Sequence, residues 1–499
     1  MEPFVEVFLK KVAFPGDEKP ALSGIELRIE KGEFIVITGP AASGKSVLCH
    51  CLTGAVPHFY PAFQDGFVRI GDTVLSELSL PRIAGKVGYM MQDPQNQLFS
   101  TTVGEDVAFG PGNMGLPRRE VRKRVREALE FVGLSGFENR LPETLSGGEA
   151  QRVVLAGVFS LKPEFLVLDQ PAAELDPAGR KDIYDRLGEL SRSGKSTIIM
   201  VSERPEELVQ HANRYLVMEE GRIVRDSSSP PVQGPYPGIP AIFRKKQTVE
   251  PGQEAASLEN CTYTYPDGRA GCLDTDLRLF RGQMVALMGL NGSGKTTVAK
   301  HFNGLLRPAS GTVRVLGREI SDIDLHILCR KVGFLFQNPD FQIFAGTVEE
   351  EAAFGLKIQR LPPEQITDRV EDVLKGAGLL QMRKVHPHRL SRGQRQMLAL
   401  ASVLAAEPEI VIADEPTAGL NYSQTCQIMD NLARLADEGK AVLLVTHDVM
   451  LTACYAHRLV AMHRHRVQLD LPVSQLPVYT TELQKIGLDF SPAFAGWSA

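Results

Sequence analysis

Four short segments of the chain recur in the same order later in the chain, and this repeat constrains the fold more than any other feature. The first pair lies 250 residues apart and the other three lie 245 apart, so the second copy has five fewer residues between its first two motifs. Four ordered pairs at a nearly constant offset indicate a tandem duplication. The matching segments are residues 39–46 and 289–296, 91–94 and 336–339, 145–149 and 390–394, and 165–171 and 410–416.

The two copies predict two domains, which agrees with a length of 499 residues, because a single core seldom grows past about 300 residues. A stretch rich in proline, glycine and serine separates the copies and is typical of a linker. We therefore expect a first domain at 1–226, a linker at 227–252, a second domain at 253–470 and a tail at 471–499.

Each copy alternates short apolar runs with longer segments that have helical spacing. The runs at 33–38 and 283–288 enter glycine-rich turns and predict buried strands. Further strands are expected at 165–168, 196–201, 410–413 and 441–446, and helices at 120–131 and 364–376. Buried strands between helices indicate an α/β fold, with a mostly parallel sheet and helices on both of its faces.

The composition excludes several classes of protein. With 43% hydrophobic and 23% charged residues the chain is neither disordered nor fibrous. The net charge of −5 gives no basic excess, so we expect no nucleic-acid partner. The seven cysteines include no CxxC pair and favour incidental buried thiols in a reducing compartment. There is no signal-peptide stretch and no apolar window of about 18 residues, so membrane crossing would need other subunits.

The first repeated motif has the form G-x-x-x-x-G-K-[ST] after a strand, which is the P-loop. Its backbone amides curl around phosphates, the helix that follows adds its dipole, and Lys45 and Lys295 reach the β- and γ-phosphates. The predicted nucleotide-binding residues are Gly39, Ala42, Ser43, Gly44, Lys45 and Ser46 in the first copy, and Gly289, Asn291, Gly292, Ser293, Gly294, Lys295, Thr296 and Thr297 in the second.

Asp169 and Asp414 each end an apolar strand, as a Walker B aspartate does. A carboxylate there can orient a magnesium ion together with the P-loop hydroxyls of Ser46 and Thr296. The alternative for each aspartate is a helix cap after a strand. The paired P-loops favour the metal role, so ATP and Mg²⁺ are the predicted cofactors.

The remaining motifs resemble those of ABC ATPases in kind and in order. Residues 145–149 look like the signature motif, which includes Ser146, Gly147 and Gly148. The resemblance also assigns Gln92 and Gln337 to the Q-loop, with a metal role, His447 to the switch, and Phe14 and Tyr265 to adenine stacking. For the two aromatic residues ordinary packing is the alternative. The resemblance implies two tandem P-loop ATPase domains, each with a sheet core and a helical subdomain.

The two copies differ at the positions that the resemblance assigns to catalysis. Glu415 follows the Walker B aspartate and can accept a proton from water, whereas its counterpart Gln170 cannot. His447 corresponds to Glu203, a carboxylate that would repel a phosphate. Arg392 stands in the second signature where the first has a glycine. We therefore predict Glu415, His447 and Gln337 as the catalytic residues.

In the family that the chain resembles, two ATPase domains pair head to tail, and each ATP lies between one P-loop and the other signature. On that arrangement Gln170, Glu203 and Arg392 fall on one composite site and spare the other. We expect the composite site that contains Gln170 to bind ATP and hydrolyse it slowly. The composite site that contains Glu415 should carry out most of the ATP hydrolysis. The alternative explanation is that these substitutions are tolerated sequence variation without a functional role.

The segments after the two Q-loop glutamines, together with one segment of the tail, resemble a particular group of ABC ATPases. Residues 93–99, 338–344 and the tail segment 482–489 look like the coupling ATPases of energy-coupling-factor transporters, which take up cobalt and vitamins. A generic surface loop is the alternative for the first two. The resemblance implies a transmembrane scaffold subunit, a separate substrate-binding membrane subunit and a place at the cytoplasmic face of the membrane.

Two other functions remain open at this point. A fused sugar-importer ATPase has a similar length, but residues 338–344 argue against it. A soluble ABC translation factor would have catalytic glutamates in both halves, and Gln170 counts against that. The transported substrate has no signal in this chain.

Overall fold

A computed structural model describes residues 3–16, 19–40, 42–92, 97–231, 252–266, 268–420 and 422–490. The chain divides into two compact units, Met1–Pro237 and Gly238–Ala499. Most of the expected linker, residues 93–96 of the first Q-loop segment and the end of the tail lie outside the described residues.

The first unit holds an antiparallel sheet in the order β2-β1-β4-β5 and a larger sheet in the order β10-β9-β3-β8-β7-β6. In the larger sheet β9, β3, β8, β7 and β6 are parallel, and β10 pairs antiparallel with β9. The strands are β1 (Val5–Ala13), β2 (Leu22–Ile29), β3 (Phe34–Thr38), β4 (Phe63–Ile70), β5 (Thr73–Val74), β6 (Val87–Met90), β7 (Phe165–Asp169), β8 (Thr197–Val201), β9 (Arg214–Glu219) and β10 (Arg222–Ser227). The α-helices are α1 (Lys45–Leu52), α2 (Ala55–His58), α3 (Leu80–Ala84), α4 (Val103–Asn113), α5 (Arg118–Phe131), α6 (Gly147–Ser160) and α7 (Pro177–Arg192).

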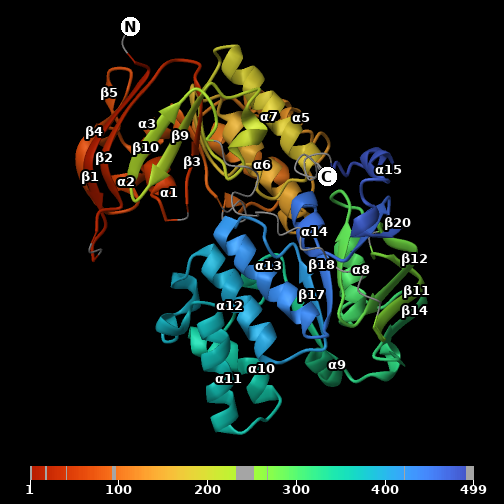
Figure 1. Ribbon diagram of the computed structural model, residues 1–499. Coiled ribbons are helices and arrows are strands. Elements are labelled where there is room, and N and C mark those ends of the chain that lie inside the picture. The colour runs from red at the N-terminus through yellow and green to blue at the C-terminus, as the bar shows by residue number, and fades with distance from the viewer. Residues whose placement is uncertain are drawn as a thin grey trace. The chain divides into compact units, whose positions relative to one another are not determined.

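The second unit repeats both sheets, in the orders β12-β11-β14-β15 and β16-β17-β18-β13-β19-β20. The strands are β11 (Glu254–Thr264), β12 (Ala270–Phe280), β13 (Met284–Met288), β14 (Ser310–Val315), β15 (Arg318–Glu319), β16 (Val332–Leu335), β17 (Ile410–Asp414), β18 (Ala441–Val445), β19 (Arg458–His463) and β20 (Arg466–Pro472). The α-helices are α8 (Lys295–Phe302), α9 (Leu325–Lys331), α10 (Val348–Ile358), α11 (Pro363–Gly376), α12 (Arg392–Ala405), α13 (Tyr422–Asp437), α14 (Val449–Tyr455) and α15 (Thr480–Lys485). Within this unit α10, α11 and α12 gather on one side and β11, β12 and β14 on the other (Figure 1).

The larger sheet of each unit is buried on both faces, which explains why its strands are continuously apolar. In β3, Ile35 and Ile37 face the antiparallel sheet and α1, whereas Phe34 and Val36 face the helices α4 to α7. This alternation confirms the predicted α/β core and its helical subdomain. The antiparallel sheets were not among the predicted elements, because their strands alternate apolar and polar residues and give no continuous apolar run.

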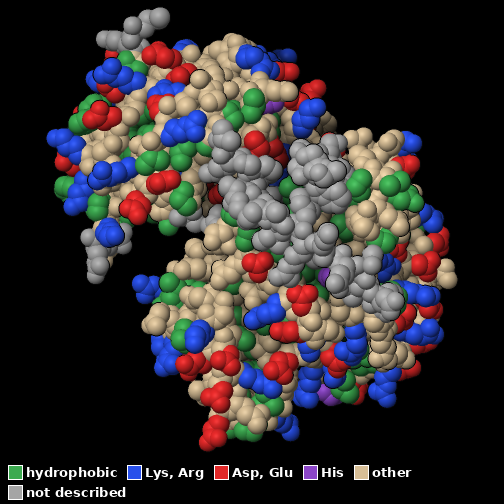
Figure 2. Space-filling model, in the orientation of Figure 1, with side chains coloured by type: hydrophobic (Ala, Val, Ile, Leu, Met, Phe, Trp, Pro, Cys, Tyr) green, Lys and Arg blue, Asp and Glu red, His purple; other side chains and the backbone are tan. Residues whose placement is uncertain are grey.

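Three further observations concern the surface charges, the character of the helices and the burial of the cysteines. Basic and acidic side chains are interspersed over the face of the molecule in Figure 2. Within the described ranges, no helix combines the length and apolar character that a membrane span requires. Most of the cysteines are buried, as expected, but Cys329 is exposed.

Candidate functional site

Both P-loops place their lysine against backbone carbonyls of the loop itself. The Lys45 Nζ donates to Gly39 O and Pro40 O at 2.7 Å each. Lys295 Nζ donates to Gly289 O at 2.8 Å. Because the two lysines are almost fully buried, their ammonium groups are directed into the loop, where phosphate oxygens would replace the carbonyls.

The loop conformation explains the glycines. Gly44 and Gly294 precede α1 and α8 with φ of 95° and 100°, a region that favours glycine. A Cβ on Gly294 would lie 2.2 Å from the carbonyl oxygen of Gly271. Ala42 takes φ of 59° where the second copy has Gly292, so the first P-loop holds a less favourable residue in the same conformation.

The remaining P-loop residues lie at the same turn. Ser43 and Ser293 are buried, and Ser293 Oγ has no hydrogen-bond partner in the structure. Asn291 precedes Gly292, and Thr297 belongs to the first turn of α8. The structure therefore brings the predicted phosphate-binding residues of each copy together at one helix N-terminus.

The Walker B aspartates end β7 and β17 beside the P-loop hydroxyls. Asp169 is hydrogen-bonded by Ser46, and Asp414 by Thr296. Each aspartate keeps one buried carboxylate oxygen, Oδ1, without a hydrogen-bond partner. Burial raises the pKa of Asp169 and raises that of Asp414 to about 6, with the hydroxyl opposing it in each case. A hydroxyl beside an unsatisfied buried carboxylate is a donor set that fits Mg²⁺.

The residue after each Walker B aspartate pairs with the switch position on the neighbouring strand end. Glu415 Oε1 lies 2.9 Å from His447 Nδ1. In the first unit Gln170 Nε2 donates to Glu203 Oε1 at 3.3 Å. Gln170 and Glu415 have φ of 54° and 46°, so both copies hold a non-glycine residue in the left-handed region at this point. Such strain is typical of functional positions.

The electrostatics of the two pairs differ. Burial alone would raise the pKa of Glu415, but the charge and the hydrogen bond of His447 outweigh it and keep the pKa below its usual value. Glu415 is therefore held ionised. Burial raises the pKa of Glu203, against the attraction of Lys45. The first unit thus places a carboxylate where the second has an imidazole.

The Q-loop glutamines are positioned differently. Gln92 Nε2 donates to Gln170 Oε1 at 3.3 Å, so it lies in the first unit's cluster. Gln337 is half-buried after β16, next to Phe336. Sequence reasoning missed the role of Gln151, whose amide donates to Gln170 O at 3.0 Å and accepts from Glu174 N at 2.9 Å. The sequence signal for such a role was that the second copy has the same residue, Gln396, at the matching position. The structure shows that Gln396 is buried as well.

The signature motifs begin α6 and α12 with the same capping box. Ser146 and Ser391 cap the helices, and Glu149 and Gln394 close the boxes. The buried Gly148 follows in the first turn of α6. The substitution in the second signature therefore leaves its helix start intact.

The glycine-to-arginine difference in the second signature is matched by a second difference nearby. A Cβ on Gly147 would lie 2.1 Å from a Glu174 carboxylate oxygen. In the second unit Arg392 replaces the glycine, and Gly419 stands at the position of Glu174. A Cβ on Gly419 would meet the Arg392 guanidinium carbon at 3.2 Å. The large and small residues have exchanged places, which explains how the second unit accommodates Arg392.

The two predicted adenine-stacking residues are half-buried. Tyr265 shares a hydrogen bond with Thr297 Oγ1, with 2.9 Å between the oxygens, and so lies against α8. Phe14 packs at the edge of the core that contains α1. The structure thus brings Tyr265 to its P-loop helix.

Each unit also exposes an aromatic pair after its Q-loop. Phe99 and Phe109 pack edge to face with ring centroids 4.7 Å apart, and Phe344 and Phe354 do so at 4.5 Å. Phe99 and Phe344 are each 65% exposed. Exposed paired aromatic residues mark candidate interaction surfaces. We call these the first and second aromatic pairs.

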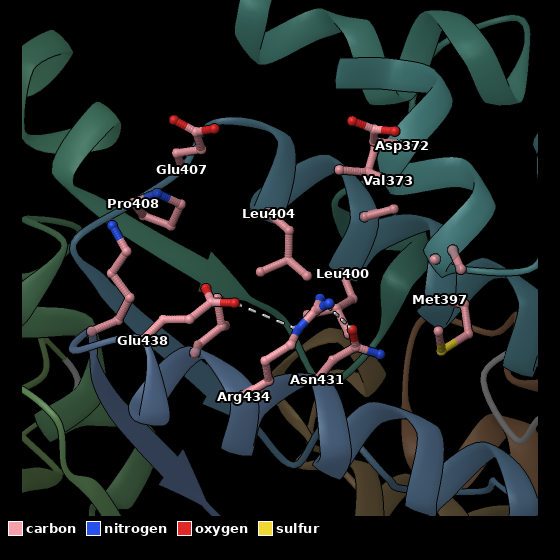
Figure 3. A pocket seen from close by; sticks show the side chains of 15 residues that line it. Asp372, Val373, Met397, Leu400, Leu404, Glu407, Pro408, Asn431, Arg434 and Glu438 are labelled. Atoms are coloured by element: carbon pink, nitrogen blue, oxygen red, sulfur yellow. Dashed lines mark hydrogen bonds and ion pairs between the residues drawn. The ribbon is translucent and has the colours of Figure 1, made fainter. Parts of the chain in front are cut away.

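A cavity of about 270 Å³ lies between α11, α12 and α13 of the second unit, and none of the predicted site residues lines it. Leu400 and Leu404 face it from α12, and Arg434 lies at its rim between Glu438 and Asn431 (Figure 3). The corresponding space of the first unit contains Phe131 and Phe159, whose rings lie 4.4 Å apart. The cavity therefore reflects divergence of the copies.

Comparisons with known proteins match this architecture. The family model described as ABC transporter matches residues 22–173 and 272–418. The chain is 36% identical to an ABC transporter ATP-binding protein of Methanosarcina acetivorans, covering 97% of this chain and 88% of that protein. It is 34% identical to one from Caldanaerobacter subterraneus subsp. tengcongensis, covering 93% and 91%.

One solved structure to which the chain is similar is that of cbiO1 from Clostridium perfringens, described as part of the ABC transporter complex cbiONQ. The two sequences are 31% identical, and the match covers 47% of this chain and 96% of that chain, with a TM-score of 0.43.

Proposed function

The chain belongs to the ABC transporter family of ATP-binding proteins and is an ATPase, and we propose that its two units have divided the work of that ATPase. The second unit hydrolyses ATP, and the first mainly binds it. The observation that carries this proposal is the 2.9 Å contact of Glu415 with His447, against the amide–carboxylate pair of Gln170 with Glu203.

In the proposed mechanism Glu415 accepts a proton from the attacking water. Its carboxylate is held ionised by His447, and the imidazole of this residue would donate to the γ-phosphate. Lys295 neutralises phosphate charge from inside the P-loop. Thr296, Asp414 and Gln337 would hold Mg²⁺, which neutralises the β- and γ-phosphate oxygens when bound.

In the first unit the phosphate-binding parts are retained. ATP and Mg²⁺ would still bind there, because the first unit has a counterpart for each of the second unit's residues Lys295, Thr296, Asp414 and Gln337. These counterparts are Lys45, Ser46, Asp169 and Gln92. Gln170 cannot take a proton, which removes a contribution of about 10²–10⁴-fold. Slow hydrolysis at this site follows.

The family resemblance supports a head-to-tail pairing of the two units within the chain. Ser146, Gly147 and Gly148 would then complete the site that contains Glu415, and Arg392 would face the site that contains Gln170. The departures from the family pattern at Gln170, Glu203 and Arg392 would then all fall on one site.

We further propose that the chain powers uptake of a vitamin or a metal ion, as an energy-coupling-factor type ATPase at the cytoplasmic face of the membrane. A transmembrane scaffold subunit would dock on the two aromatic pairs, and a separate membrane subunit would bind the substrate. Support comes from the exposure of Phe99 and Phe344 immediately after the Q-loops.

The deciding experiment compares Glu415→Gln with Gln170→Ala in steady-state ATPase assays. The first should nearly abolish turnover while nucleotide binding persists, and the second should change it little. Robust hydrolysis by the Glu415→Gln protein would overturn the division of labour. For the transport proposal, Phe344→Ala/Phe354→Ala should lose the membrane proteins that co-purify with the wild type from detergent extracts.

A further inference from the structure

The loop that adjoins the second aromatic pair differs in charge from its counterpart in the first unit. Residues 383–389, which we call the basic loop, contain Arg383, Lys384 and Arg389 together with two histidines. The corresponding residues 138–144 contain two glutamates and one arginine. The duplication therefore holds the backbone position constant while the charge changes sign.

Backbone hydrogen bonds fix the basic loop at the N-terminal end of α10, the helix that carries Phe354 of the second aromatic pair. The amide of Val348, the first residue of α10, donates to Val385 O at 3.1 Å, and that of Glu349 donates to Arg383 O at 2.9 Å. Phe354 lies on the same helix, and Phe344 precedes it. The first unit makes the same two hydrogen bonds. The amide of Val103 donates to the carbonyl oxygen of Arg140, and the amide of Gly104 donates to that of Glu138. Each aromatic pair thus has a loop at its border.

The acidic groups near the basic loop do not account for its charge. The carboxylate of Glu349 pairs with Lys384, at 2.6 Å between Nζ and Oε2. Both units carry acidic residues in the first turn of the helix, Glu349 to Glu351 in α10 and Glu105 with Asp106 in α4. The helices differ by one acidic residue, Glu349 in place of Gly104, and Lys384 pairs with it. The side chains of Arg383 and Arg389 are exposed and carry the remaining charge difference between the loops.

In the first unit the single arginine is already engaged. The Arg140 guanidinium lies 3.9 Å from the centroid of the Phe137 ring, and its Nη1 lies 3.3 Å from a Glu149 carboxylate oxygen. Glu143 of that loop is exposed. The first loop therefore presents a carboxylate where the second presents cations.

The second unit also extends its apolar surface. Phe341 is 72% exposed and Ile358 is 54% exposed, whereas the corresponding residues are Asn96 and Asn113. An apolar stripe bordered by cations is complementary to a helix with an apolar face and an acidic flank.

We propose that the two docking surfaces accept chemically different segments of the membrane partner, and that the second unit binds an amphipathic segment with acidic residues along its flank. The proposal rests on the docking role of the aromatic pairs given above. Opposite charge at the two borders would fix which segment meets which unit, since a like-charge pairing is disfavoured.

The test uses the full chain and three synthetic helical peptides with the same apolar face and glutamate, glutamine or lysine on the flank. Binding is measured by fluorescence anisotropy at low and high salt. The wild type should bind the glutamate peptide about 10-fold more tightly than the glutamine peptide, since several exposed ion pairs each contribute modestly. That preference should fade as salt rises.

The matched variants exchange the charges of the two loops. Arg383→Glu/Lys384→Asn/Arg389→Thr installs residues of the first copy and should lose the preference for glutamate, with ATPase activity unchanged. Glu138→Arg/Asn139→Lys/Thr144→Arg should create a second site for the glutamate peptide. Equal affinity of the wild type for all three peptides would overturn the inference.

Two further measurements separate the possible failures. If Phe344→Ala/Phe354→Ala leaves peptide binding unchanged, the docking role of the aromatic pair is wrong. If the basic-loop variant instead loses binding to phosphatidylglycerol vesicles and keeps its preference among the peptides, the loop binds lipid headgroups and the inference is wrong.

Discussion

The Glu415 carboxylate and the His447 imidazole lie 2.9 Å apart at the ends of two adjacent parallel strands. The first unit places Gln170 and Glu203 at the same strand ends, with 3.3 Å between amide nitrogen and carboxylate. The fold thus builds the same pair of positions twice and fills them with different chemistry. The left-handed backbone at Gln170 and Glu415 is common to both, so the two units share the scaffold, but only the second has a carboxylate at this position.

The imidazole of His447 should be needed for turnover. His447→Ala removes the hydrogen bond and the charge that keep Glu415 ionised, together with the imidazole that we propose donates to the γ-phosphate. We expect the ATPase rate to fall by about 10²-fold or more, with ATP binding retained. Steady-state phosphate release and equilibrium binding of a fluorescent ATP analogue measure the two quantities.

Glu203→Ala is the matched control for that variant. It changes the same position of the first copy and should alter turnover by less than about threefold, because Gln170 gives that site no general base. Equal losses in the two variants would contradict the assignment of turnover to the second unit.

The cavity beside α11 offers a test of packing. Gly376→Phe/Leu404→Phe introduces into the second unit the edge-to-face pair that Phe131 and Phe159 form in the first. A Cβ on Gly376 meets nothing within 4 Å, so the new side chain has room to start. We expect a gain of about 1 kcal/mol in the free energy of unfolding of the second unit, measured by urea denaturation.

The reverse exchange provides the control for the packing argument. Phe131→Gly/Phe159→Leu should destabilise the first unit by about 2 kcal/mol or more, since it opens a cavity and adds a glycine to a helix. A loss of stability in Gly376→Phe/Leu404→Phe would mean that the space is too narrow for two rings.

The structure also predicts an acid-dependent contribution to the stability of the second unit. Glu409 pairs with Lys331 at 2.6 Å and with Arg281, and these hydrogen bonds hold its pKa below the usual value. Because the folded pKa is depressed, the contribution is complete above the unfolded pKa of about 4.3 and is lost as pH falls through the folded pKa.

Glu409→Gln should therefore cost about 1 kcal/mol at pH 7 and have a smaller effect below pH 4. Urea denaturation at the two pH values measures the difference. Glu164→Gln, at the same position of the first copy, changes an exposed residue and should be neutral. A constant cost of Glu409→Gln at all pH values would point to packing as its cause.

The parts of the molecule that were predictable are those fixed by local chemistry. The P-loops, β7 and β17 follow from glycine spacing and continuous apolar runs, and the structure confirms them. The Gly147/Glu174 and Arg392/Gly419 exchange was not predictable, because its partners are far apart in the chain and meet through tertiary packing. The same holds for Gln151, whose bonds to Gln170 and Glu174 depend on how α6 lies against the end of β7.

The C-terminal tail, whose role the sequence left open, lies against the second P-loop. Leu483, Leu488 and Phe490 are buried in the core that contains β13, the strand leading into that loop. A Cβ on Gly487 would lie 2.9 Å from the Leu290 side chain, and Leu290 follows the first P-loop glycine. The tail therefore supports the conformation of the loop that binds the phosphates.

Gly487→Ala should weaken ATP binding at the second site, because the added methyl group pushes on Leu290 and Gly487 has φ of 85°. The matched control is Gly439→Ala, which carries the same backbone strain at φ of 86° but meets nothing within 4 Å. We expect the two variants to lose similar stability, and Gly487→Ala alone to show a several-fold rise in the dissociation constant for a fluorescent ATP analogue. To keep the first site out of the measurement, both changes are made with Lys45→Ala. Equal affinities in the two variants would show that the tail stabilises the unit without acting on its P-loop.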